Sequence, residues 1–342
     1  MLNVQSADSG KVPGFLQIRE SLPFVFLQGY ASFLDQVGSG EWRLIATDDG
    51  RVLMPVRIFK SRFMKMVQIL HAPIEQGVRL TKEHEKEFLD QWVRYLVMEG
   101  IVDRVVQPPT HVVFKAAPEQ TISSGFGSYY LPLDEKSESD LFAEMHGKHR
   151  NVIRNAEKKG VEVKFGKGEL SNFYKLYQNT MKKAGMFCEP LSYFEKLQDC
   201  LTEKKLLCGV AYFDNEPQGA LLMPFSEFGA YYVYGASSEK IQVNGAMNFL
   251  HWRVILYMKK QGVKRYDFVG ARLSNVAGTK LGGIQQFKER FGARLEKGVL
   301  WKKDIRIWKC KIYDRLIALS FLIKGMSLKG DIIDQEIRKK DS

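Results

Sequence analysis

Residues 262–292, GVKRYDFVGARLSNVAGTKLGGIQQFKERFG, are the stretch around which the chain is organised. Gly262 ends a predicted helix over Trp252–Gln261, and the tight alternation of Arg265–Val269 predicts a buried strand. A glycine-rich loop and a short cationic helix around Lys288 follow. A strand, a glycine-rich loop and a cationic helix form a suitable holder for an anionic or carbonyl substrate. An ordinary strand–loop–helix unit of an α/β domain explains the same features equally well.

The length and composition describe a globular protein with a strong positive charge. The 342 residues suffice for two domains of ordinary size, and 45% hydrophobic with 26% charged residues is typical of a soluble fold. A formal net charge of +12 and a pI near 9.3 favour polyanionic partners. Nucleic acid, phosphorylated precursors and an acidic membrane face all meet that condition.

The cysteines and the apolar runs bear on compartment and cofactors. The four cysteines have neither CxxC spacing nor a neighbouring histidine, so we expect reduced structural thiols and no metal site. The first residues lack the charged and apolar regions of a secretory signal. The apolar run 316–323 is far shorter than the roughly 20 residues that a membrane-spanning helix needs. We therefore expect a cytoplasmic protein with no tightly bound cofactor, whose membrane contact is peripheral and at the inner membrane face.

The first half of the chain predicts an α+β unit with a mostly antiparallel sheet. Trp42–Ala46 and Val52–Phe59 read as two strands joined by a tight turn at Asp48-Asp49-Gly50. Thr81 is placed to cap a helix with an apolar stripe. Ser139 is the expected cap of a second helical region.

A cationic stripe follows that second helical region. Arg150, Arg154 and Lys158 stand at i, i+4 and i+8, so a helix ending at Gly160 would align them on one face. Such a stripe faces a substrate phosphate or is simply a solvated helix surface, and the sequence favours neither interpretation.

The second half has the element order of an acyltransferase core. Strands are predicted over Leu206–Phe213, Pro217–Pro224 and Ala230–Gly235, then a helix from Asn244, then the strand at Arg265. This is the order of the GNAT fold, a mixed sheet flanked by helices.

The C-terminal segment combines cations with aromatic residues. Seven basic residues lie between Lys297 and Arg315, Trp301, Trp308 and Tyr313 are interleaved with them, and the apolar run 316–323 follows. This composition suits an interfacial helix on anionic lipid, and it suits a terminal helix packed on the core slightly better.

Five short motifs, in order, resemble the FemABX family of aminoacyltransferases, whose members add amino acids to peptidoglycan precursors. The motifs are Phe26-Leu27-Gln28, the RNVIRNAEKKGV stretch at 150–161, YYVYGAS at 231–237, YDFVG at 266–270 and FKERFG at 287–292. The resemblance implies two GNAT-like domains with mixed, largely antiparallel sheets flanked by helices and a cleft between them. On that basis the N-terminal domain spans residues 1–145, the C-terminal domain with the transfer site spans 146–300, and a basic, apolar helical segment spans 301–342.

The chain departs from the family pattern in ways that concern the acceptor. His71-Ala72-Pro73-Ile74 stands where many members have a basic residue before Gly-Pro, and no heptad stretch corresponds to the coiled-coil arm of some members. Related proteins also act in surface-polysaccharide pathways.

The resemblance also implies an activity. It is the transfer of an aminoacyl group from aminoacyl-tRNA to an amine of a nucleotide- or lipid-linked envelope precursor. Lys288 matches the family lysine after phenylalanine and is the expected catalytic residue, supplying positive charge where an oxyanion develops. The expected substrate-binding residues are Arg150, Arg154, Lys158, Tyr232, Tyr234, Asp267 and Phe287. No Ser-His-Asp or Cys-His set is evident, so a covalent enzyme intermediate is not expected.

Two alternatives remain open. An acyl-CoA-dependent GNAT enzyme would hold pyrophosphate on a loop such as 242–247, QVNGAM, which fits the required pattern until Met247. A non-enzymatic basic module for RNA or for a membrane surface would depend on Lys302, Lys303 and Lys309 instead.

Overall fold

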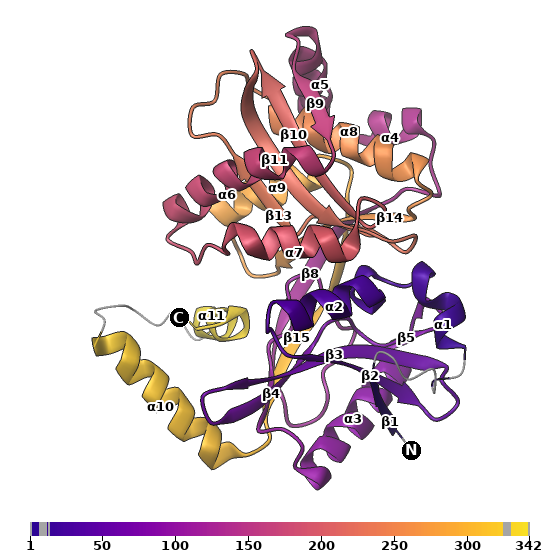
Figure 1. Ribbon diagram of the computed structural model, residues 1–342, viewed down its shortest axis with the longest axis vertical. Coiled ribbons are helices and arrows are strands. Elements are labelled where there is room, and N and C mark those ends of the chain that lie inside the picture. The colour runs from indigo at the N-terminus through magenta and orange to yellow at the C-terminus, as the bar shows by residue number, and fades with distance from the viewer. Residues whose placement is uncertain (1, 7–11, 13, 324–329, 341–342) are drawn as a thin grey trace.

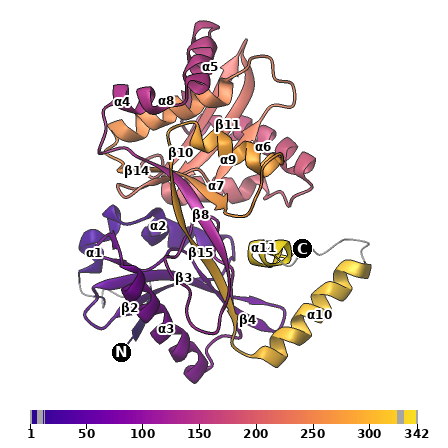
Figure 2. The same ribbon diagram turned by 180° about the vertical axis from the view of Figure 1, so that it is seen from behind.

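Two lobes joined by a pair of long strands make up the computed structural model, which describes residues 2–6, 12, 14–323 and 330–340 (Figures 1 and 2). The long strands are β8 (Ile122–Pro132) and β15 (Arg294–Asp304), which pair antiparallel along most of their length. Both run from one lobe into the other.

The first lobe is built on antiparallel strands covered by a long helix. Its helix α3 (Lys82–Glu99) begins at the predicted cap, where the Thr81 hydroxyl accepts the N–H of His84. Trp92 of this helix packs edge-on against Trp301 of β15, with ring centroids 6.4 Å apart. The strands of this lobe are β1 (Leu2–Ser6), β2 (Glu41–Thr47), β3 (Val52–Ser61), β4 (Met64–Ile69), β5 (Ile74–Glu75), β6 (Val78–Arg79) and β7 (Arg104–Val106). The shorter helical pieces are α1 (Phe15–Ile18), η1 (Arg19–Ser21), η2 (Phe24–Phe26) and α2 (Gln28–Gln36).

The second lobe surrounds a four-stranded sheet in the order β13-β11-β10-β9. The cap of its first helix is Ser137, with Asp140 completing a capping box, so the predicted cap, Ser139, was wrong by two positions. The strands of this lobe are β9 (Glu162–Phe165), β10 (Leu206–Phe213), β11 (Glu216–Pro224), β12 (Ala230–Tyr231), β13 (Tyr234–Ser237) and β14 (Arg265–Arg272). Its helices are α4 (Glu138–Glu144), α5 (Gly147–Lys158), η3 (Lys167–Glu169), α6 (Leu170–Ala184), α7 (Leu191–Leu201), α8 (Ala246–Lys260) and α9 (Lys280–Glu289).

The larger sheet is continuous through both lobes. Its strand order is β1-β2-β3-β4-β7-β15-β8-β14-β12, and its pairings are antiparallel except for β4 with β7 and β12 with β14. The predicted fold class of largely antiparallel sheets flanked by helices is therefore confirmed. Where the two units divide remains a prediction, because β8 and β15 belong to both.

One predicted strand is in fact two strands in different sheets. The chain leaves the large sheet after β12 and joins the small sheet at β13, so a single strand over Ala230–Gly235 was wrong. Two backbone hydrogen bonds fix the break. The N–H of Tyr232 donates to the carbonyl oxygen of Asp267 at 2.8 Å, and the N–H of Val233 donates to the carbonyl oxygen of Tyr231 at 2.8 Å. The second bond spans only two residues, which is the pattern of a γ-turn. The sheets consequently part at Tyr232 and Val233.

The lobes also share a hydrophobic core away from the long strands. Buried side chains of α2, such as Phe33, pack with Phe194 and Leu197 of α7. The two helices approach so closely that a β-carbon on Gly29 would lie 2.2 Å from the Cys200 carbonyl oxygen. Glycine at position 29 is therefore a packing requirement.

The C-terminal segment forms two helices after β15. Helix α10 (Ile307–Ile323) extends away from the first lobe, and α11 (Ile332–Lys340) lies back against β8 (Figures 1 and 2). Over the stretches that the structure describes, no helix has both the length and the apolar character needed to cross a bilayer.

Candidate functional site

An open groove of about 690 Å³ lies where the two sheets part. One wall comes from the connection between β12 and β13, the other from helix α9, and the floor from β14 and α8. Among the described residues β13 is an edge strand of the small sheet, paired only with β11. The lining residues are Tyr232, Val233, Gly235, Ser237, Met247, Phe268, Val269, Lys280, Gly283, Ile284, Phe287 and Lys288.

Lys288 is the buried cation of this groove, with only 6% of its surface exposed. Its Nζ donates to the carbonyl oxygens of Val269 and Gly270, the second at 2.7 Å. Burial lowers the pKa of Lys288 to about 8, while the charge of Asp267 acts in the opposite direction. Since two of its three protons are held by carbonyls, an ammonium at neutral pH keeps one donor for a ligand.

The carbonyls that hold Lys288 belong to an irregularity in β14. The pairing of β14 with β8 shifts register between Asp267 and Gly270. Val269 there has a φ of 50°, a left-handed conformation that is costly for a β-branched residue. The Asp267 carboxylate compensates by accepting the N–H of Val269 at 2.8 Å. The bulge thus turns two successive carbonyls toward α9, where Lys288 meets them.

Asp267 is itself buried and fully engaged. It accepts the Ser128 hydroxyl at 2.5 Å and forms an ion pair with Arg265 at 2.8 Å. Arg265 is shared with Glu296 at 2.7 Å and lies over the ring of Tyr130 at 3.9 Å. Asp267 therefore supports the bulge from behind and does not line the groove that Lys288 lines.

The three aromatic rings that line the groove, those of Tyr232, Phe268 and Phe287, contact a histidine that the sequence did not single out. His251 of α8 is fully buried, contacts the rings of Tyr232 at 4.5 Å and Phe287 at 5.4 Å, and shares a 2.6 Å hydrogen bond between its Nδ1 and the Tyr266 hydroxyl. Burial lowers its pKa to about 3, so it is neutral. In the sequence it occupies an apolar face of a helix, which gives no signal of a site.

Tyr232 owes its position to a glycine. A β-carbon on Gly235 would lie 1.9 Å from the Tyr232 hydroxyl oxygen, so only glycine leaves room for that side chain. Burial raises the pKa of Tyr232 to about 12, and its hydroxyl stays protonated at neutral pH. Tyr232 and Phe287 therefore stand with Lys288 in one groove.

Tyr234 lies instead in a second cavity, of about 270 Å³, between the lobes. Its hydroxyl is 3.1 Å from that of Tyr193, and Tyr30 and Arg57 line the same cavity. Val233 lines both cavities, so the β12–β13 connection forms the partition between them.

The cations of α5 are placed apart from the groove. Arg150 donates to the carbonyls of Ala143 and Met145, at 2.6 and 2.5 Å, and so completes the end of α4. The Arg154 guanidinium lies 5.1 Å from the centroid of the Phe142 ring, and Lys158 is exposed. None of the three lines the groove at Lys288 or the cavity between the lobes.

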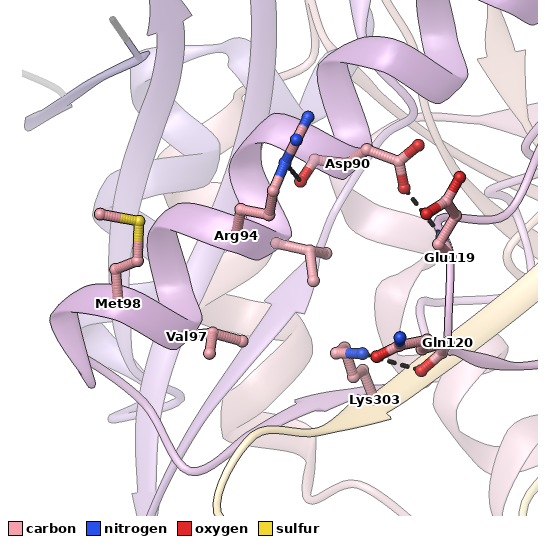
Figure 3. Close-up of a pocket in the computed structure, with 8 residues that line it drawn as sticks. Asp90, Arg94, Val97, Met98, Glu119, Gln120 and Lys303 are labelled. Carbon is pink, nitrogen blue, oxygen red and sulfur yellow. Dashed lines mark hydrogen bonds between the residues drawn. The ribbon is translucent and has the colours of Figure 1, made fainter.

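A further hollow, of about 530 Å³, lies beside α3 (Figure 3). Its polar groups satisfy one another: Lys303 donates to the Gln120 carbonyl at 2.8 Å, and the Asp90 carboxylate accepts the N–H of Glu119 at 2.8 Å. It contains no buried cation and no bulged strand. The groove at Lys288 is therefore the better candidate for acyl-transfer chemistry.

The chain is similar to known proteins in sequence and in fold. The model of the FemAB family matches residues 120–218 and 217–299, together more than half of the chain. No curated protein sequence matches. The crystal structure of FemX is similar with a TM-score of 0.61 and 16% identity, over 80% of this chain and 90% of that one.

Two further solved structures share the fold at lower similarity. The structure of L-PGS from Bacillus licheniformis has a TM-score of 0.51 and 15% identity, over 88% of this chain and 93% of that chain. The C-terminal domain of a putative lysylphosphatidylglycerol synthetase from Agrobacterium fabrum has a TM-score of 0.52 and 11% identity, over 88% of this chain and 96% of that chain.

Proposed function

The chain belongs to the FemAB family and is an acyltransferase, and we propose that it moves an aminoacyl group from aminoacyl-tRNA to an amine of a cell-envelope precursor. The acceptor is a nucleotide- or lipid-linked intermediate of peptidoglycan or of a surface polysaccharide. The observation that carries this proposal is the buried Lys288 ammonium at the base of an open, mostly apolar groove.

The chemistry follows from the charge that the reaction develops. The acceptor amine attacks the ester carbonyl, so a C–N bond forms and negative charge collects on the carbonyl oxygen. The C–O bond to the tRNA ribose then breaks, and the proton lost by the amine is taken up by the ribose oxygen. A fixed positive charge in a low-dielectric groove stabilises the oxyanion more than the neutral ester, which is the condition for catalysis.

Lys288 is suited to this role because its position is fixed before substrate arrives. Two backbone carbonyls hold the ammonium, and Asp267 holds the bulge that presents them. A pKa of about 8 leaves Lys288 mostly charged at neutral pH. A preorganised charge of this kind needs no reorganisation in the transition state.

Phe287 and Tyr232 flank the ammonium and supply an apolar surface for the aminoacyl side chain or the acceptor stem. Tyr234 and the cavity between the lobes adjoin the groove across Val233. We assign the groove to the reacting ester and the cavity between the lobes to part of the acceptor. Arg150, Arg154 and Lys158 remain proposed contacts for tRNA phosphates outside the groove, of which the exposed Lys158 is the freest to make one.

Acyl-CoA is the alternative donor, and the local geometry favours it less. The loop that would hold pyrophosphate is already bonded to the neighbouring strand. The Gln218 side-chain amide donates to Oε1 of Gln242 at 3.2 Å, and the backbone N–H of Gln242 donates to Oε1 of Gln218 at 2.9 Å. Val152 of α5 lies 2.4 Å from the place that a β-carbon on Gly245 would occupy, at the start of α8.

The test is a transfer assay with defined donors. Purified protein is incubated with a pool of charged tRNAs and envelope precursors, and products are read by mass spectrometry. The proposal expects a mass gain of one amino-acid residue on the precursor. Transfer from acetyl-CoA with none from charged tRNA would replace the proposed donor, and no transfer from either would overturn the proposal.

A further inference from the structure

Helix α10 has two apolar faces, and only one of them is covered. The covered face carries Cys310, Tyr313 and Ile317, spaced by three and four residues. Cys310 is fully buried, and the Tyr313 hydroxyl is 2.8 Å from that of Ser61 at the end of β3. Through this face α10 packs on the first lobe, as the sequence favoured for the C-terminal segment.

The opposite face is exposed along the whole helix. Trp308, Leu319 and Leu322 are 67%, 52% and 74% exposed, which is unusual for such large apolar side chains. Positions separated by three or four residues recur on one side of a helix, so these side chains form a single stripe. The stripe, hereafter the outer face of α10, consists of Trp308, Ile312, Leu316, Leu319, Leu322 and Ile323.

The charges around the outer face have one sign. Lys311 and Arg315 are exposed beside it and form no ion pair within the described part of the chain. The acidic residue of the helix, Asp314, is held by Arg104 at 2.7 Å. A second anchor ties the start of the helix to the body, where Lys309 reaches the buried Asp103 at 2.7 Å. The helix is thus fixed at its base and presents an apolar, cationic surface outward.

We propose that the outer face of α10 lies flat on an anionic lipid surface. The helix of 17 residues is about 25 Å long and is not a membrane span, so its apolar stripe would enter the headgroup region side-on. Lys311 and Arg315 then lie at the level of the lipid phosphates, where each cation adds to binding. This contact goes beyond the proposed transfer and does not depend on it.

A second copy of the chain fits the outer face less well. A symmetric contact between two α10 helices would bring the Lys311 and Arg315 side chains of both copies together. The carboxylate within reach, Asp314, is already engaged with Arg104. Like charges without a counter-charge oppose such an interface, whereas anionic lipid supplies the missing negative charge.

The test measures binding to vesicles by sedimentation. The wild-type protein should bind vesicles of equal parts phosphatidylglycerol and phosphatidylcholine at least about tenfold more tightly than vesicles of phosphatidylcholine alone. Leu319→Glu with Leu322→Glu should weaken binding to the anionic vesicles by more than about tenfold. Lys311→Gln with Arg315→Gln should remove most of the preference for phosphatidylglycerol.

Matched variants keep the result interpretable. Met98 and Val97 are exposed apolar residues on α3, so Met98→Glu with Val97→Glu adds the same charge elsewhere and should leave vesicle binding unchanged. Lys288→Met should bind vesicles like the wild type, which separates this inference from the transfer activity. Equal binding of anionic and neutral vesicles, or no effect of the Leu319 and Leu322 substitutions, would overturn the proposal. So would a lipid-free dimer, seen by size-exclusion chromatography, that the same two substitutions dissociate.

Discussion

The groove at Lys288 and the stripe on α5 contain the same kind of side chain in opposite surroundings. Lys288 is buried on two carbonyls beside a bulged strand, whereas the α5 cations cap a neighbouring helix, stack on a ring or point into solvent. An exposed charge is screened by water and salt, while a buried charge acts through a medium of low polarisability. One buried lysine is therefore expected to affect the reaction more than three surface cations.

The comparison is tested most strongly at Lys288 itself. Lys288→Met removes the charge at similar volume and should lower kcat by about 100-fold. The melting temperature should stay near that of the wild type, because the loss of a desolvated charge offsets the unpaired carbonyls. Transfer is followed by quenched-flow mass spectrometry, and folding by circular dichroism.

Lys280 provides the control for that substitution. It lines the same groove but is exposed, so Lys280→Met should change kcat by less than about threefold. Equal losses in the two variants would mean that charge in the groove matters and burial does not.

Substitution of Asp267, which supports the bulge that holds Lys288, should have the next largest effect. Asp267→Asn keeps an acceptor for the Val269 N–H but removes the charge that favours the Lys288 ammonium. The pKa of Lys288 should fall further, and transfer at pH 7.5 should drop by about tenfold. Urea denaturation should report a loss of about 2 kcal/mol, because Arg265 loses one of its two carboxylate partners and keeps Glu296. Unchanged transfer in this variant would show that the bulge is held without the carboxylate charge.

A smaller effect is expected from substitution of Gly235, which lies against the Tyr232 hydroxyl. The added methyl in Gly235→Ala overlaps the Tyr232 hydroxyl, so the ring must leave its place in the groove wall. We expect about a fivefold rise in KM and a destabilisation of about 1 to 2 kcal/mol. Gly168→Ala is the matched control, since a β-carbon there meets no atom within 4 Å. If both variants behave like the wild type, Tyr232 does not shape the groove.

The α5 stripe should give the smallest effect. Arg154→Ala with Lys158→Ala should change kcat by less than about twofold and raise KM for tRNA modestly, more at low salt than at high salt. Arg150→Ala should act through stability instead, costing about 1 kcal/mol, because it caps the carbonyls at the end of α4. A 100-fold loss of kcat in the double variant would invert the comparison.

The sequence predicted the elements of the groove but not its opening. Alternation at Arg265–Val269 and the glycines around it located β14 and α9, and resemblance singled out Lys288. The parting of the sheets could not be predicted, because it depends on a bond from Tyr232 to Asp267, 35 positions apart in the chain. His251 was missed for a related reason: a histidine on an apolar helix face looks the same whether it lies under a groove or in a core.

The periodic spacing of the charged residues indicated less about their function than their burial does. The spacing of Arg150, Arg154 and Lys158 correctly predicted a helix, but spacing does not distinguish a cap or a stacked guanidinium from a phosphate contact. For the C-terminal segment, the sequence is compatible with a helix packed on the core and with a helix on anionic lipid. In the structure one face of α10 packs on the protein, and the opposite face is exposed.

The pH dependence of the rate ratio between wild type and Lys288→Met tests the role of the buried charge most directly. The pKa of the acceptor amine affects both enzymes equally, so the ratio isolates Lys288. With a pKa of about 8 in the folded protein, Lys288 is charged below pH 8 and loses its proton above it. The single-turnover ratio should therefore be near 100 at pH 7 and about tenfold lower at pH 9. A ratio that stays constant between pH 7 and pH 9 would contradict the account.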